Sequence, residues 1–315
     1  MGEPKIRLNP TIVSIRDRVL LQRALQILLS CALLLPKKKS IGRGRKPYDY
    51  RMMLVLCIMR IILRNSYADY ESVMRTDVRI MDVLGMKKLP CKSTVNNYAF
   101  QFTLPFLTKF NMRVVDPWIK KPVDLLLDAS GIRLVGRSIW FCIRTNKKIR
   151  KKDCDKIHIA VSLCSLLIAN FKISNSRRND SPFLRKLLAQ FCKLGLIIVD
   201  KGYSNKTNAV FVAKKCGAFF SPFKSNVKPS GLNVWAYMYR LWEAFPSLCK
   251  GIYCHRNKVE AVFSALKSRY GDQLYSRRWY TRRREMAMRF IAYNVKIIIA
   301  IQIAREKGIP LWVEA

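Results

Sequence analysis

The sequence carries far more positive than negative charge, and this imbalance restricts what a compact chain of its composition can be. Lysine and arginine number 59, aspartate and glutamate number 20, and the formal net charge is +39. Half of the 315 residues are hydrophobic, which is enough for a sizeable buried core. A compact body with this charge repels itself unless a polyanion neutralises it, and nucleic acid is the commonest such partner. The charge therefore predicts the class of partner but not the activity.

Cysteine and histidine usage favours an intracellular chain without a zinc finger. The ten cysteines are scattered with no C-x-x-C pair, which favours reduced thiols over a disulfide framework. Cys249, Cys254 and His255 lie close in sequence but do not match a usual finger spacing. The apolar stretch 24–35 is too short to span a bilayer, and charges such as Lys296 interrupt the other apolar stretches. We predict a soluble cytoplasmic protein, associated with the nucleoid and without a membrane partner.

The first third of the chain has helical hydrophobic patterns. An amphipathic pattern in residues 1–35 ends at Pro36, and residues 50–106 are helical in pattern throughout. Between them, segment 36–49 combines lysines and arginines with two glycines and two prolines, which is typical of an exposed basic arm. We therefore predict an all-α domain over residues 1–118.

Cap and turn residues divide this region into short helices. Ser66 and Ser93 are expected N-caps, and Gly85 is an expected helix stop. Short helices joined by tight turns in a basic setting favour a helix-turn-helix-type domain, with residues 92–102 as its recognition helix. A helical bundle without DNA contact is the alternative that the pattern leaves open.

After Pro122, short apolar runs alternate with helical stretches. Residues 156–174 predict two β-strands around a turn, and residues 181–195 predict a helix closed by Gly195. Alternation of strands and helices is typical of an α/β domain. The sequence therefore predicts an α/β fold over residues 119–315.

Two aspartates end apolar runs in this second domain. Asp128 ends "LLLD" and Asp200 ends "LIIVD", so each is expected at or just beyond the end of a buried strand, before a turn. Functional groups of α/β domains are often exposed at that position, although an aspartate also commonly begins a turn. Because acids are rare in this chain, two such aspartates favour a functional role.

The stretch "YCHRNKVEAVFSALK", residues 253–267, places a carboxylate among basic residues on a predicted helix. At about 100° per residue, four polar side chains fall within a stripe about 60° wide. These are Tyr253, Arg256, Glu260 and Lys267, and the adjoining apolar face contains Val259, Val262, Phe263 and Leu266. A simple i,i+4 ion pair would account for Glu260 and Arg256, but not for the alignment of all four residues.

The spacing Y253-x2-R256-x3-E260-x6-K267 resembles the Y-R-E-K signature of DDE transposases of the insertion-sequence four/five group. Asp128 and Asp200 fall where that family has its first and second aspartates. The resemblance covers roughly residues 45–300. Lys201 stands where the family often has arginine. A carboxylate-rich loop is missing near residues 137–152, which leaves the hairpin after the first strand undetermined.

The resemblance implies a ribonuclease H-like catalytic domain, with a mixed five-stranded sheet flanked by helices. It implies that Asp128, Asp200 and Glu260 hold two Mg²⁺ or Mn²⁺ ions and that Tyr253, Arg256 and Lys267 contact DNA. The partners would be double-stranded DNA, both transposon ends and target, and a second copy of the chain in a synaptic homodimer.

Three carboxylates suit this chemistry because Mg²⁺ prefers oxygen ligands, and two such ions can assist an in-line displacement at a phosphodiester. The predicted activity is metal-dependent hydrolysis and strand transfer at the ends of an insertion sequence. Two alternatives stay open: a nuclease of the same fold without strand transfer, and a non-enzymatic DNA-binding protein derived from a transposase.

Two other features have simpler interpretations. His158 lies in a strand pattern and is predicted to be structural rather than catalytic. The basic stretch 276–289 is predicted to contact DNA, with a solvated helix face as the alternative.

Overall fold

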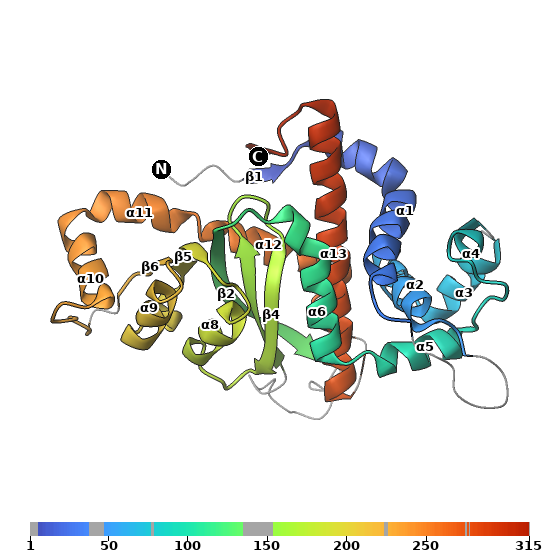
Figure 1. Ribbon diagram of the computed structural model, residues 1–315, viewed down its shortest axis with the longest axis horizontal. Coiled ribbons are helices and arrows are strands. Elements are labelled where there is room, and N and C mark those ends of the chain that lie inside the picture. Colours follow the sequence, from blue (N-terminus) through green and yellow to red (C-terminus); the bar gives the residue numbers. More distant parts are fainter. Residues whose placement is uncertain are drawn as a thin grey trace, which may run out of the picture. The chain divides into compact units, whose positions relative to one another are not determined.

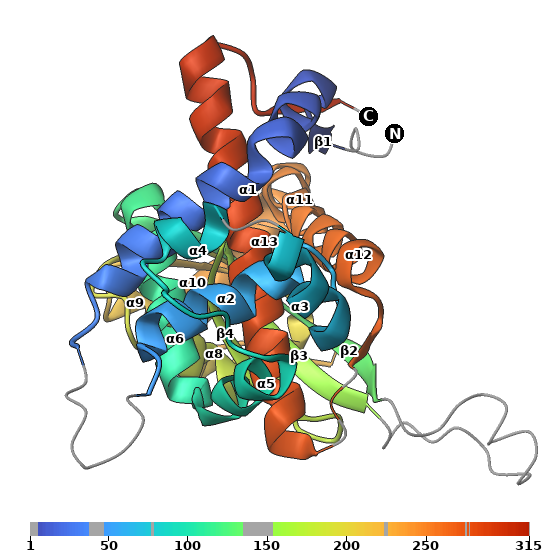
Figure 2. The same ribbon diagram turned by 90° about the vertical axis from the view of Figure 1, so that its right-hand side faces the viewer.

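The computed structural model describes residues 6–37, 47–76, 79–134, 154–223, 226–274, 276 and 278–314. Most of the predicted basic arm and the hairpin after the first strand lie outside these residues. The chain divides into two compact units. The first comprises Val115–Arg277 with Met1–Ile6 and Glu314–Ala315, and the second comprises Arg7–Val114 with Arg278–Val313. Figures 1 and 2 show the elements from two directions.

The first unit is built on a mixed β-sheet. Its strands are β2 (Val123–Leu134), β3 (Cys154–Ser162), β4 (Ile168–Asn175), β5 (Leu194–Val199), β6 (Ala218–Phe220) and β7 (Gln273–Leu274). The order is β4-β3-β2-β5-β6, and the two-residue β7 pairs with β2. Strands β2, β3 and β4 are antiparallel neighbours, whereas β5 runs parallel to both β2 and β6. This arrangement confirms the predicted mixed five-stranded α/β sheet and fits a ribonuclease H-like domain.

Strand β2 lies in the middle of the sheet and is covered on both faces. Leu125, Leu126 and Leu127 are all fully buried, which explains the unbroken apolar run in the sequence. Leu125 and Leu127 belong to a core cluster with helix α8 (Ser181–Leu188) and helix α9 (Lys206–Ala213). Because side chains alternate along a strand, Leu126 and Asp128 face the opposite side, where helix α12 (Asn257–Tyr270) packs on β2.

The predicted helix closure at Gly195 is wrong. Helix α8 ends at Leu188, and Gly195 lies in β5. A side chain at Gly195 would collide with the carboxylate of Asp124, which accepts a hydrogen bond from the Leu196 N–H at 2.6 Å. The glycine therefore permits a close contact between neighbouring strands rather than ending a helix.

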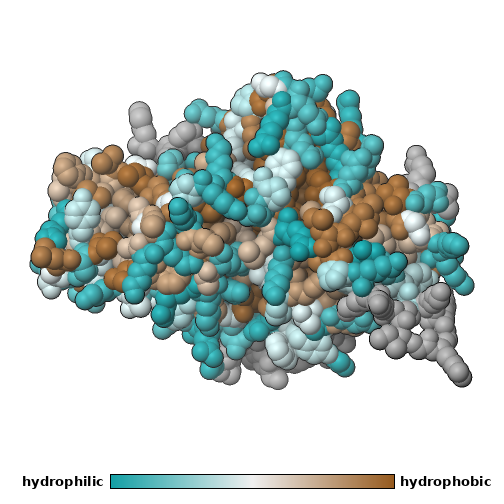
Figure 3. All heavy atoms as spheres, in the orientation of Figure 1, coloured by the Kyte–Doolittle hydropathy of each residue, from teal (hydrophilic) through white to brown (hydrophobic). Residues whose placement is uncertain are grey.

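Helices α10 (Val234–Ala244) and α11 (Pro246–Cys254) lie between β6 and α12, in the interval between Asp200 and Glu260. Large side chains are exposed on and between these helices: Val234 and Tyr237 of α10, Phe245 at the junction and Leu248 of α11. Hydrophobic residues, in brown, gather at the left of Figure 3. The first unit also contains the short 3₁₀ helices η1 (Asp116–Trp118) and η3 (Lys201–Tyr203).

The second unit is helical apart from the short paired strands β1 (Ile6–Leu8) and β8 (Trp312–Glu314), each of which crosses a unit boundary. Its helices are α1 (Pro10–Leu33), α2 (Tyr50–Ile62), α3 (Tyr67–Thr76), α4 (Arg79–Val83), α5 (Lys92–Gln101), α6 (Leu104–Val115) and α13 (Trp279–Lys307). Helix α13 packs against α1 and α2. The predicted division placed all of 119–315 in the catalytic domain, whereas the compact units group α13 with the N-terminal helices. The assignment of DNA binding to residues 1–118 and of catalysis to residues 119–315 stays a prediction.

Helix α13 is buried along most of its length. Within the described part of the chain it is the one helix long and apolar enough to cross a membrane, but 94% of its apolar window is buried inside the protein. Burial of this extent is what the core helix of a compact unit shows.

The local helix signals have mixed outcomes. Ser66 caps α3 as predicted, because its hydroxyl accepts from the Asp69 N–H at 3.1 Å while the Asp69 carboxylate accepts from the Ser66 N–H. Gly85 ends α4 as predicted, with φ at +61°. The prediction for Ser93 is wrong, because α5 begins at Lys92 after Cys91.

A buried amide pair in the second unit gives a test of its packing. The Asn294 side chain of α13 donates to the Asn111 side-chain oxygen at 2.8 Å, and both residues are fully buried. Asn111→Ala removes the acceptor of a buried donor, so we expect a loss of about 1–3 kcal/mol in the free energy of unfolding. Urea denaturation of the full chain measures it.

Arg23→Ala is the matched control. Arg23 also joins α13, through an ion pair with Glu306 at 2.8 Å, but Glu306 is half exposed. Solvent screens such pairs, so we expect a much smaller change than for Asn111→Ala. Equal losses in the two variants would contradict the importance of the buried pair.

Candidate active site

The sheet brings the two predicted aspartates together. Strands β2 and β5 are parallel neighbours, and their register pairs Leu127 with Val199. The residue after Leu127 is Asp128 and the residue after Val199 is Asp200, so the two carboxylates lie beside each other. Asp200 directly follows β5, as predicted. Asp128 lies within β2 rather than at its end, because pairing with β3 extends β2 to Leu134.

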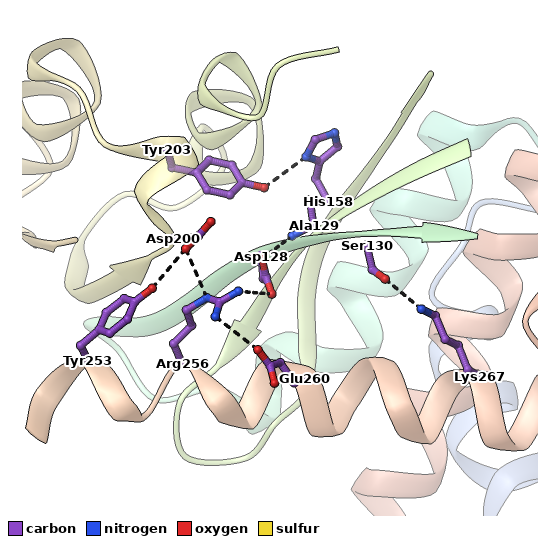
Figure 4. Close-up of polar contacts among 10 residues, drawn as sticks. All are labelled: Asp128, Ala129, Ser130, His158, Asp200, Tyr203, Tyr253, Arg256, Glu260 and Lys267. Atoms are coloured by element: carbon purple, nitrogen blue, oxygen red, sulfur yellow. Dashed lines mark hydrogen bonds and ion pairs between the residues drawn. The ribbon is translucent and has the colours of Figure 1, made fainter. Parts of the chain in front are cut away.

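The guanidinium of Arg256 contacts all three predicted acids (Figure 4). Its Nη2 donates to Asp128 Oδ2 at 3.0 Å, and its Nη1 donates to Glu260 Oε1 at 3.3 Å. Its Nε lies 3.9 Å from Asp200 Oδ1, which is an ion-pair distance but too long for a hydrogen bond. One positive charge thus lies between three carboxylates that come from β2, the end of β5 and helix α12.

The predicted helical stripe is interrupted. Tyr253 belongs to α11, and α12 begins only at Asn257. His255 and Arg256 keep right-handed helical backbone angles across the break, so the polar side chains still point to one side. The predicted apolar face of α12 is confirmed, since its members are all buried: Val259, Val262, Phe263 and Leu266.

Burial affects the titration of two residues at the site. It raises the pKa of Asp128, an effect that the Arg256 charge and the hydrogen bond from the Ala129 N–H partly offset. Burial also raises the pKa of Tyr253, and the negative charge of Asp200 adds to this effect. Tyr253 is therefore a neutral hydroxyl that donates to Asp200 Oδ1 at 3.2 Å.

An open groove continues from the acids along α12. Its lining comes from the residues after Asp128 on β2 and from one face of α12: Asp128, Ala129, Ser130, Glu260, Phe263, Ser264, Lys267 and Ser268. Lys267 Nζ donates to Ser130 Oγ at 3.0 Å. Sequence reasoning missed Ser130, although its position two residues after Asp128 places it on the same face of the strand.

A second polar cluster lies on the other face of β2. His158 of β3, which pairs with Ala129 of β2, is fully buried. Its ring stacks on Phe183 of α8 at 4.0 Å between centroids, and it hydrogen-bonds with Tyr203 Oη at 3.1 Å and Ser174 Oγ at 2.9 Å. Tyr203 follows Asp200 in η3, so this cluster anchors the turn that carries Asp200. The predicted structural role of His158 agrees with these contacts.

The acids suit a divalent metal ion in their chemistry. In the regions that the structure describes, no three acidic, histidine or cysteine side chains are grouped closely enough to hold a metal ion between them. The three carboxylates nevertheless surround one cation, the Arg256 guanidinium, and carboxylate oxygens are the ligands that Mg²⁺ and Mn²⁺ prefer. The residue types of Asp128, Asp200 and Glu260 therefore suit a divalent ion, whereas their spacing around Arg256 does not form a metal site.

The α/β sheet brings Asp128 and Asp200 together on neighbouring parallel strands, and sequence comparison identifies the family. Residues 119–295, more than half of the chain, match the transposase DDE domain family. The chain therefore belongs to the DDE transposases, a family that generally uses divalent metal ions. The match confirms the coarser part of the prediction, that the chain is a DDE transposase.

Two further comparisons complete these findings. No curated protein matches the chain. Among solved structures, the chain is similar to the cryo-EM structure of a piggyBac transposase synaptic complex with hairpin DNA. Identity is 11%, the alignment covers 92% of this chain and 74% of that chain, and the TM-score is 0.45.

The burial of His158 predicts a pH dependence of stability. Burial lowers the pKa of His158 from 6.5 to about 4. Between these values the unfolded chain binds a proton that the folded chain does not, so the contribution of His158 to stability is present above pH 6.5 and is lost toward pH 4. We expect His158→Gln to make the fall in urea midpoint between about pH 8 and about pH 5 smaller than in the wild type. An identical fall in both proteins would contradict a neutral buried His158.

Proposed function

We propose that the chain is the transposase of an insertion sequence of the four/five group, which cuts and rejoins the ends of its element by phosphodiester hydrolysis and strand transfer. The observation that carries the proposal is the meeting of six motif residues from four elements along one face: Asp128, Asp200, Tyr253, Arg256, Glu260 and Lys267. Membership of the DDE transposase family supports it.

Each acid has a distinct place in the proposed reaction. Asp128 is nearly buried, with 12% of its side chain exposed, whereas Glu260 is 61% exposed at the groove. Asp128, Asp200 and Glu260 would hold two Mg²⁺ or Mn²⁺ ions, which activate the attacking oxygen and stabilise the leaving oxygen when bound. The buried position of Asp128 provides a rigid ligand, and the exposed position of Glu260 leaves room for the substrate.

The cations and the tyrosine position DNA in this proposal. Lys267 is a flexible point charge beside the groove, and Arg256 offers a planar two-pronged contact to a phosphate. Tyr253 holds Asp200 through its hydroxyl and lies close enough to Arg256 to feel its charge. These three side chains would orient the terminal phosphodiester of the element against the acids.

Recognition of the element's ends is assigned to α5. The helix buries Val95 and Ala99 and exposes Lys92, Asn97 and Gln101. Asparagine and glutamine can read adenine in the major groove, and lysine contacts phosphates.

The proposed partners are double-stranded DNA of the element's ends and of the target. A homodimer would form the synaptic complex, and the nucleoid would be the site of action.

The first test separates chemistry from binding. Asp128→Asn should abolish cleavage of cognate ends in Mg²⁺ and the joining of precut ends to a target plasmid. Binding of the ends, measured by titration, should be as strong as in the wild type or stronger, because a negative charge has left a site for phosphates.

Asp116→Asn is the matched control, because Asp116 is exposed in the same unit and pairs with Lys121 in an exposed ion pair. It should cut and join normally. Cleavage by Asp128→Asn at the wild-type rate would contradict the catalytic assignment, and cleavage without any joining in the wild type would favour the nuclease alternative.

The second test concerns sequence recognition. Because α13 packs on α1 and α2, a fragment that ends at residue 118 lacks part of its core, and the full chain is used. Asn97→Ala should reduce the preference for cognate ends over random duplex by about 1–3 kcal/mol. Lys92→Ala should weaken binding to both duplexes equally and reduce the salt slope by about one. Full discrimination by Asn97→Ala would remove α5 as the recognition helix.

A further inference from the structure

Besides its proposed contact with DNA, Arg256 affects whether a metal ion can bind between the three acids. The guanidinium makes ion pairs with all three carboxylates at once, at 3.0, 3.3 and 3.9 Å. Its side chain is only 20% exposed, so it is enclosed by the site rather than extended into solvent. Arg256 thus occupies the position where the three acids converge.

A guanidinium and a divalent cation cannot share this position. Arginine has five N–H donors and no acceptor, so it cannot ligate a metal ion, and it carries charge of the same sign. The Asp128 oxygen that accepts from Arg256 would have to exchange that hydrogen bond for a metal bond. Binding of a metal ion among the three acids therefore requires Arg256 to leave.

The arrangement also explains how three acids remain together without metal. Carboxylates crowded at one position repel each other, and a buried acid such as Asp128 is costly to leave unpaired. Arg256 offsets part of that repulsion with contacts on Asp128, Asp200 and Glu260. Lys267, on the same helix, makes a hydrogen bond to Ser130 instead.

We propose that Arg256 is a built-in counter-cation that occupies the metal position of the DNA-free enzyme and competes with divalent ions for Asp128, Asp200 and Glu260. The inference rests on the proposed function, because it takes these acids as the metal ligands. The proposal adds that Arg256 lowers the affinity of the three acids for divalent metal ions. Arg256 leaves the acids when the metal ion binds.

The test measures Mn²⁺ binding to the full chain without DNA, by titration calorimetry or by the electron paramagnetic resonance signal of free Mn²⁺. Arg256→Ala should bind Mn²⁺ at least about tenfold more tightly than the wild type, because the acids no longer have to be released from the guanidinium. Arg256→Gln, which keeps most of the stem and a polar head, should behave in the same way and replaces the alanine variant if that variant does not fold.

Lys267→Ala is the control for charge alone. It removes the same charge from the same helix face without emptying the position between the acids, so its Mn²⁺ affinity should stay within about twofold of the wild type. Equal tightening in the Lys267 and Arg256 variants would show a general charge effect and overturn the proposal. Unchanged affinity in both Arg256 variants would overturn it as well.

Thermal unfolding provides an independent measurement. Without Mn²⁺, Arg256→Gln should melt below the wild type, because three carboxylates lose their counter-charge. Saturating Mn²⁺ should raise its melting temperature more than that of the wild type, because stabilisation grows with affinity. A smaller rise than in the wild type would count against competition.

The double variant Asp128→Asn with Arg256→Gln distinguishes this proposal from the proposed function. It should lose the gain in Mn²⁺ affinity. If it binds Mn²⁺ as tightly as Arg256→Gln, the acids are not the ligands, and the proposed metal roles fail together with the inference. If Arg256→Gln gains no affinity while Asp128→Asn has lost cleavage, only the counter-cation proposal fails.

Discussion

The first unit depends on keeping three carboxylates close together in a partly buried site. Such a group is unfavourable on its own, since like charges repel and burial penalises the charged form of Asp128. The Arg256 guanidinium makes the arrangement possible by contacting each acid. Because these acids come from two strands and a helix, the same charge also ties β2, the end of β5 and α12 together. The ion pairs that balance the charge of the three acids therefore also connect the three elements that carry them.

The central strand keeps the acidic site separate from the packing that supports it. Asp128 and Ser130 face α12, whereas Leu127 points to the other face, into the core with α8 and α9. On that second face, His158 and Tyr203 hold the turn after Asp200 through hydrogen bonds in a buried setting. Side-chain alternation lets one strand present charge on one face and apolar packing on the other. A substitution on the supporting face is thus expected to move Asp200 without replacing any of the three acids.

Much of the site was predictable because its signals are local. The apolar runs before Asp128 and Asp200 indicate buried strands, and the helical period aligns Arg256 with Glu260. The break at His255 was not predictable, since the backbone there stays helical in its angles and only the hydrogen-bond ladder is interrupted. Gly195 was misread because its role depends on Asp124, which lies on a neighbouring strand. Long-range packing decides such positions, and local periodicity does not contain it.

The grouping of α13 with the N-terminal helices has a consequence for the order in which the protein matures. A ribosome releases α1 and α2 long before the helix that packs on them, Trp279–Lys307, because Val115–Arg277 of the first unit lies between them in the sequence. Until then the nascent chain carries apolar helix faces that have no native partner, and chaperones are suited to shield such surfaces. A product of translation interrupted before Trp279 would lack this helix and so could not complete the second unit. Synthesis through Lys307 thereby becomes a condition for completing the packing of the N-terminal helices.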